Sequence, residues 1–96
     1  MKLNELRDLC HLRASNKGFH LERFPLTHYI MLIVTELAEA VEADRKNNEE
    51  MFKEEIADVF IRLFDFCGLF EIDIEEEILK KMEKNKNRPH KHGKKY

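Results

Sequence analysis

The sequence is poor in residues that crosslink or interrupt a chain. Its 96 residues include two cysteines, two prolines, three glycines and no tryptophan. Cys10 and Cys67 lie within apolar helical patterns, so reduced core thiols and a cytoplasmic location fit better than a disulfide. Because glycine and proline are few and lie between the periodic segments, the sequence favours helices.

A long hydrophobic run is also missing. The chain lacks the stretch of about 20 apolar residues that a membrane span needs. Its first residues, Met1-Lys2-Leu3-Asn4-Glu5, are too polar for a secretory signal. We therefore expect a single domain over residues 1–96 that does not enter a membrane. Since a chain of this length buries a limited core, we also expect it to share surface with a second copy.

The apolar periodicity predicts an all-α fold, a four-helix bundle followed by an extended basic tail over residues 86–96. Gly18 would end the first helix, while Thr27 and Asp73 would cap the second and fourth. The expected helices cover residues 3–17, 27–46, 50–68 and 74–85.

Charge is distributed unevenly. Residues 1–79 carry nine Lys and Arg against eighteen Asp and Glu, whereas residues 80–96 carry eight Lys and Arg against Glu83 alone. An acidic body disfavours broad contact with a nucleic-acid backbone, so we expect the basic tail to act on small phosphates instead.

Two acidic pairs lie inside the apolar helical stretches, Glu36-x-x-Glu39 and Glu55-x-x-Asp58. Carboxylates three apart on a helix project from one face, with Cβ atoms about 5–6 Å apart. Glu36 also falls within a second apolar sector of its helix, opposite the main apolar stripe. We expect that stripe to consist of Ile30, Val34, Leu37, Ala38 and Val41.

Four carboxylates on two buried helices need partners. A structural alternative is ion pairing, and an Asp58–Arg62 bridge at i,i+4 is one such pair. Glu36 and Glu39, however, have no Lys or Arg three or four residues away. A divalent cation therefore explains the two pairs together better than surface ion pairs do.

An all-oxygen ligand set suits Mg²⁺, Mn²⁺ or Ca²⁺ rather than zinc. A di-iron bundle would need Glu-x-x-His on two helices, which this chain lacks. A cation held here would act on phosphates, which predicts phosphoryl or nucleotidyl hydrolysis. The absence of a Gly-rich Walker loop excludes a P-loop enzyme.

With these motifs the sequence resembles the MazG-like family of all-α nucleoside triphosphate pyrophosphohydrolases. The family motif is Glu-x-x-Glu, then a dozen or more residues, then Glu-x-x-Asp. Here residues 40–54 separate the two halves. The tail Lys81-x-x-x-Asn85-x-x-Arg88-Pro89 is similar to that of small stand-alone and phage-type members.

The resemblance implies cleavage of an NTP or dNTP to the monophosphate and pyrophosphate. It implies Mg²⁺, with Mn²⁺ as a substitute, held by four carboxylates that also orient or deprotonate the attacking water. It further implies a homodimer or homotetramer with active sites near the subunit contacts. The catalytic and metal-binding candidates are Glu36, Glu39, Glu55 and Asp58, and the substrate-binding candidates are Lys81, Asn85 and Arg88.

Two further cations are candidates for substrate phosphates, Lys91 in the tail and Lys17 beside the first loop. Phe19, Phe24 and Tyr29 fit either the core or a base-stacking role. Two other functions stay open: a non-catalytic helical oligomer, and a nucleic-acid binder that uses residues 80–96. His11, His20 and His28 show no readable pattern.

Overall fold

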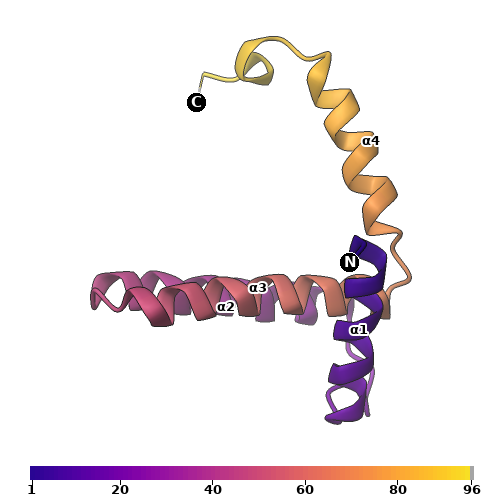
Figure 1. Cartoon of the computed structure of the whole chain (residues 1–96), viewed down its shortest axis with the longest axis vertical. Helices are drawn as coiled ribbons and strands as arrows, with labels where there is room; N and C mark the ends of the chain where they lie inside the picture. The colour runs from indigo at the N-terminus through magenta and orange to yellow at the C-terminus, as the bar shows by residue number, and fades with distance from the viewer. Residues whose placement is uncertain (96) are drawn as a thin grey trace.

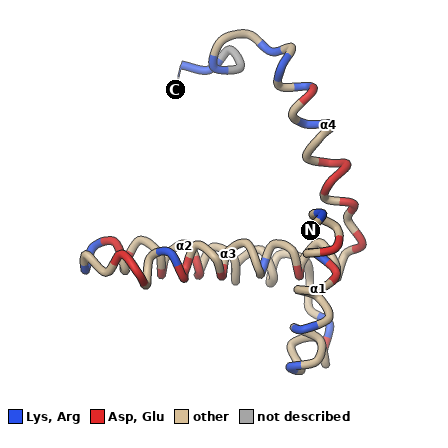
Figure 2. The backbone as a smooth tube through the Cα atoms, in the orientation of Figure 1, with Lys and Arg blue, Asp and Glu red and all other residues tan. Residues whose placement is uncertain are grey.

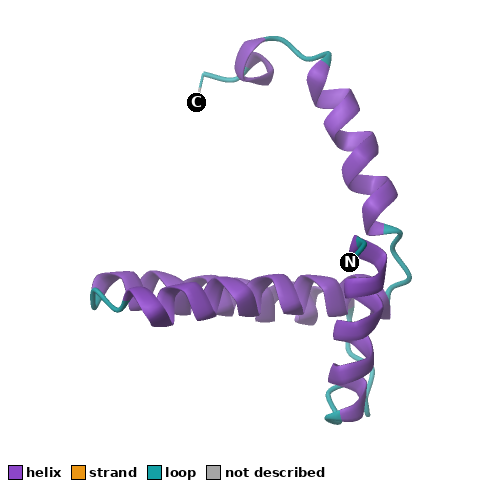
Figure 3. Cartoon of the chain, viewed as in Figure 1, coloured by secondary structure: helices purple, strands orange, loops and turns teal. Residues whose placement is uncertain are grey.

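The computed structural model describes residues 1–95, apart from the side chains at positions 92 and 93. Four α-helices and one 3₁₀ helix make up this part of the chain, and it contains no strand (Figure 3). None of these helices is both long and apolar enough to cross a membrane. The elements are α1 (Leu3–Asn16), α2 (Leu26–Arg45), α3 (Glu49–Leu69), α4 (Ile74–Lys86) and η1 (His90–Gly93).

The helix starts follow local capping chemistry. Asp73 caps α4 as predicted, because its carboxylate accepts a hydrogen bond from the backbone N–H of Glu76. The prediction of Thr27 as a cap is wrong. Helix α2 begins after Pro25, whose φ of −58° is already helical, and Thr27 lies inside the first turn. Asn48 provides the equivalent cap for α3.

Three helices end in the same way. The residue after the C-cap has a left-handed φ: 85° at Gly18, 55° at Asn47 and 55° at Glu71. The next backbone N–H then bonds back to the last turn, for example from Phe19 to the Ala14 carbonyl at 3.1 Å. This is the Schellman motif, which favours glycine at the left-handed position, so Gly18 ends α1 as predicted.

The α2–α3 pair is the centre of the molecule. The two helices run antiparallel, side by side, and α1 crosses α3 near its C-terminal end (Figure 1). Helix α4 contacts α1 but leaves the bundle, so the chain does not form a closed four-helix bundle by itself. The side chains buried between α1, α2 and α3 are Cys10, Tyr29, Ile33, Glu36, Ala40, Ala43, Val59 and Cys67.

The face of α2 that packs on α3 differs from the expected one. Ala40 and Ala43 are 3% and 1% exposed, because small side chains let α3 approach closely. The predicted main apolar stripe instead faces outward. Its larger members are 38–52% exposed: Ile30, Val34, Leu37 and Val41. A wide apolar surface is therefore left uncovered on the single chain.

Gly68 sets the contact between α1 and α3. A Cβ at this position would lie 2.5 Å from the Cβ of His11 and 2.9 Å from its Cγ. Such distances are far below van der Waals contact, so the missing side chain is what allows α1 to lie against α3. His11 is thereby held beside α3.

The tail departs from the extended conformation predicted for residues 86–96. Helix α4 continues to Lys86, and His90–Gly93 form one turn of 3₁₀ helix. Tyr96, the last residue of the predicted tail, lies outside the described residues. Basic residues dominate the second half of α4 and the segment that follows it, while the first half of α4 is acidic (Figure 2).

Candidate functional site

The α2–α3 hairpin brings the two acidic pairs together. Glu39 lies eight residues before Asn47 in the turn, and Glu55 lies eight residues after it. Positions equidistant from the turn of an antiparallel hairpin lie at the same height along it. Accordingly, carboxylate oxygens of Glu36, Glu39 and Glu55 all lie within 4.8 Å of one another. Three of the four predicted metal ligands converge.

Glu36 is the most buried member of this acidic cluster of Glu36, Glu39 and Glu55. Its residue exposure is 9%, which agrees with its predicted place in an apolar sector. Arg62 donates a hydrogen bond from Nε to Glu36 Oε1 at 2.7 Å. Burial alone would raise the pKa of Glu36, but the hydrogen bond and charge of Arg62 outweigh it and lower the pKa. Arg62 therefore pairs with Glu36 across the helices, rather than with Asp58 along α3 as the ion-pair alternative predicted.

Glu55 has the opposite environment. Burial, followed by its contacts with Glu39 and Glu36, raises the pKa of Glu55 from 4.5 to about 7. Its Oε2 atom is buried and has no hydrogen-bond partner in the described part of the chain. A carboxylate crowded by others and left unpaired would be stabilised by a cation. The donor set thus fits a hard divalent ion with oxygen ligands.

A cavity of about 560 Å³ runs along this face of the hairpin, within the size range of small-molecule sites. Glu36, Asp58 and Arg62 line its charged end. Asp58 is one helical turn beyond Glu55 and does not belong to the close trio, but it borders the same cavity. The rest of the lining is mainly aromatic and apolar, and it includes Phe19, His20, Phe24, His28, Tyr29, Leu32 and Ile61.

The predicted substrate-binding residues are not at this cavity in the single chain. Lys81, Asn85 and Arg88 belong to α4 and the turn after it, which lead away from the α2–α3 pair (Figure 1). Arg88 donates a hydrogen bond from Nη1 to Asn85 Oδ1 at 3.3 Å. Lys91 is exposed in η1. Lys17 is exposed at the end of α1, next to the cavity residue Gly18.

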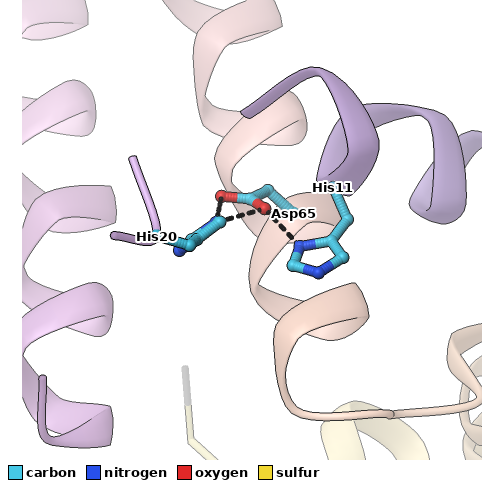
Figure 4. A group of neighbouring side chains, drawn as sticks. All are labelled: His11, His20 and Asp65. Carbon is cyan, nitrogen blue, oxygen red and sulfur yellow. Dashed lines mark hydrogen bonds and ion pairs between the residues drawn. The ribbon is translucent and has the colours of Figure 1, made fainter. Parts of the chain in front are cut away.

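A second group, formed by His11, His20 and Asp65, was not predicted from the sequence (Figure 4). His11, in α1, and His20, in the loop after it, lie 54 and 45 positions before Asp65 of α3. Local periodicity carries no information about such distant contacts. His20 and Asp65 line the cavity at the end away from the acidic cluster.

A scan against protein families matches residues 24–93 to the MazG nucleotide pyrophosphohydrolase domain. The chain belongs to the MazG family. The match includes both acidic pairs and α4, so the resemblance inferred from the motifs is confirmed. No curated protein and no solved structure matches the chain. Membership of the MazG family implies a nucleotide pyrophosphohydrolase, and the all-α fold is consistent with it.

Proposed function

We propose that this MazG-family protein hydrolyses a nucleoside triphosphate, ribo or deoxy, to the monophosphate and pyrophosphate. The observation that carries the proposal is the convergence of Glu36, Glu39 and Glu55, because Glu36 of this cluster also lines a nucleotide-sized cavity together with Asp58. Water would add to the α-phosphorus as the bond to the bridging α–β oxygen breaks, so pyrophosphate leaves.

Glu36, Glu39 and Glu55 would hold Mg²⁺, or Mn²⁺ in its place, with Asp58 completing the acidic set. When bound, this ion would neutralise charge on the phosphates and lower the pKa of a water molecule. Arg62 keeps Glu36 ionised and oriented before the ion binds. One carboxylate of this set would also orient the attacking water or accept its proton.

The cavity suggests how the nucleoside would lie. Asp58 and Asp65 are seven residues apart on α3, which is about 10.5 Å along a helix axis. That span accommodates a nucleoside with its first phosphate. The base would then lie among Phe24, His28 and Tyr29, where aromatic faces favour stacking.

A second copy would complete the site. The outward apolar stripe of α2 needs a cover, and α4 points away from the chain's own bundle. In a homodimer or homotetramer, α4 of one copy can reach the cavity of another and bring Lys81, Asn85 and Arg88 to its phosphates. Arg supplies a bidentate fork for phosphate and Lys a point charge.

The test is product analysis with a panel of NTPs and dNTPs, in Mg²⁺ and in EDTA. We expect equal amounts of pyrophosphate and monophosphate, with turnover lost in EDTA and reduced about 100-fold or more in Glu39→Gln. Glu42→Gln is the matched control, because Glu42 is an exposed acid on the same helix and its loss should leave turnover unchanged. Release of single phosphate, or no turnover in a folded sample, would refute the proposal. The second result would favour the non-catalytic oligomer.

A further inference from the structure

The cluster of His11, His20 and Asp65 joins three separate elements: α1, the α1–α2 loop and α3. His11 Nδ1 lies 2.9 Å from Asp65 Oδ1. His20 Nε2 lies 2.8 Å from the same oxygen and 3.0 Å from Oδ2. Figure 4 shows both imidazole rings directed at the one carboxylate. All three potential ligand atoms lie within 4.8 Å of one another.

The cluster is held by packing and is mostly shielded from water. Side-chain exposure is 31% for His11, 11% for His20 and 18% for Asp65. Gly68, one turn after Asp65, leaves room for the His11 side chain to lie against α3. The rings of His11 and His20 are 5.1 Å apart, and Tyr29 backs His20 at 6.0 Å. Ligands that are fixed in advance lose little entropy when an ion binds.

Hydrogen bonding within the cluster does not satisfy His20. Its Nδ1 atom is buried and has no partner among the described residues. This nitrogen is not the one that faces Asp65, so it is not itself a ligand of the cluster. Both contacts of the ring use Nε2, which faces the two oxygens of Asp65 together.

We propose that His11, His20 and Asp65 form a transition-metal site for Zn²⁺ or a similar ion, separate from the acidic cluster. Two imidazole nitrogens and one carboxylate suit borderline metals, whereas Mg²⁺ prefers oxygen alone. His11 would bind through Nδ1, His20 through Nε2 and Asp65 through a carboxylate oxygen. Each ring would then carry its proton on the other nitrogen, and a fourth position remains for water.

Such an ion would tie the N-terminal helix and its loop to α3. His20 and Asp65 also line the cavity, so the site would fix the shape of its inner end. This role depends on the contacts of the cluster and not on the proposed hydrolase activity. An experiment can therefore refute the metal site without refuting the hydrolase activity, and the reverse.

The experiment titrates the full chain with Co²⁺ and then with competing Zn²⁺, in excess Mg²⁺ to occupy oxygen-only sites. We expect one Co²⁺ per chain with visible absorption of a nitrogen–oxygen site and no sulfur-to-metal band, and displacement by Zn²⁺. His20→Gln and Asp65→Asn should each weaken binding by roughly 100-fold or more. Zn²⁺ should also raise the melting temperature of the wild type and not of these variants.

Controls separate this site from others on the chain. Glu39→Gln and His28→Gln should bind Co²⁺ as the wild type does. His11 is partly exposed, so His11→Gln tests a ligand with little effect on folding, and it should also weaken binding. No stoichiometric binding, unchanged affinity in His11→Gln, a sulfur-to-metal band from Cys10, or loss of binding in Glu39→Gln would each overturn the proposal.

Discussion

Glu36 places a negative charge inside the α2–α3 contact, next to two other carboxylates. Its hydrogen bond from Arg62 compensates the burial and keeps its pKa low. Burial, and then the neighbouring carboxyl groups of Glu39 and Glu36, raise the pKa of Glu55 to about 7. Two acids of one cluster therefore have opposite pKa shifts, and perturbed pKa values of this kind are enriched at functional sites.

Glu55 predicts a specific dependence of stability on pH. Its pKa is about 7 in the folded chain and about 4.5 when unfolded, so the folded state binds the proton more tightly. In EDTA, the free energy of unfolding should therefore fall as the pH rises from 4.5 to 7 and then level off. Glu55→Gln should remove this part of the slope. Urea unfolding across this range measures the difference, and identical slopes would contradict the pKa shift.

At the scale of the helices, caps and periodicity were enough to locate the elements. Asp73 and Gly18 marked helix ends because each satisfies backbone groups through local contacts alone. Periodicity did not tell which apolar sector of α2 faces α3. That choice depends on the small size of Ala40 and Ala43 and on the shape of the α3 surface that packs against them. Thr27 failed as a cap because Pro25 starts the helix earlier.

In the candidate site too, the features set by local spacing could be predicted, and those set by contacts between distant residues could not. The acidic pairs were visible because their spacing on each helix is local, and the hairpin turn then sets them opposite one another. The Arg62–Glu36 pair spans 26 residues of sequence, and the His11–Asp65 contact spans 54. Both arise from helix packing. Gly68 allows the approach of His11 to α3, and the residues around Gly68 in the sequence do not indicate this.

Gly68→Ala tests the close packing of α1 on α3. The added methyl group would meet the Cβ of His11 at 2.5 Å, so α1 would have to move. Overpacking costs about 1–3 kcal/mol, more than the gain of up to about 1 kcal/mol from helix propensity. We expect a net loss of about 1–2 kcal/mol in urea unfolding. Ala57→Gly, at an exposed site on α3, calibrates the propensity effect, and a stabilised Gly68→Ala chain would contradict the packing.

Glu71→Gly should stabilise the chain. Glu71 ends α3 with a φ of 55°, a conformation that costs a side-chain-bearing residue about 1–2 kcal/mol. Since glycine lacks this penalty but has more freedom to lose on folding, we expect a net gain of up to about 1 kcal/mol. Thermal and urea unfolding measure it. Gly18→Ala, at a φ of 85°, should show the reverse effect, and a destabilised Glu71→Gly chain would argue against the Schellman geometry.

At the scale of the whole molecule, the exposed stripe of α2 predicts self-association. Val34 and Val41 are 45% and 52% exposed, and charge placed there should prevent a second copy from covering them. We expect the wild type to sediment as a dimer or tetramer and the Val34→Glu/Val41→Glu variant as a monomer with a lower melting temperature. Thr35→Glu, on a different face of α2, should leave the assembly intact. A wild type that sediments as a monomer would contradict the prediction.

The departure of α4 from the bundle also has a genetic consequence. If α4 serves the cavity of a neighbouring copy, an allele carrying Glu39→Gln and an allele carrying Arg88→Ala are each inactive alone. A mixed dimer, however, contains one site with both defects and one with neither. Co-expression should then restore up to about a quarter of normal turnover for randomly paired dimers. Two null alleles of one gene would thus complement each other, as though they lay in different genes.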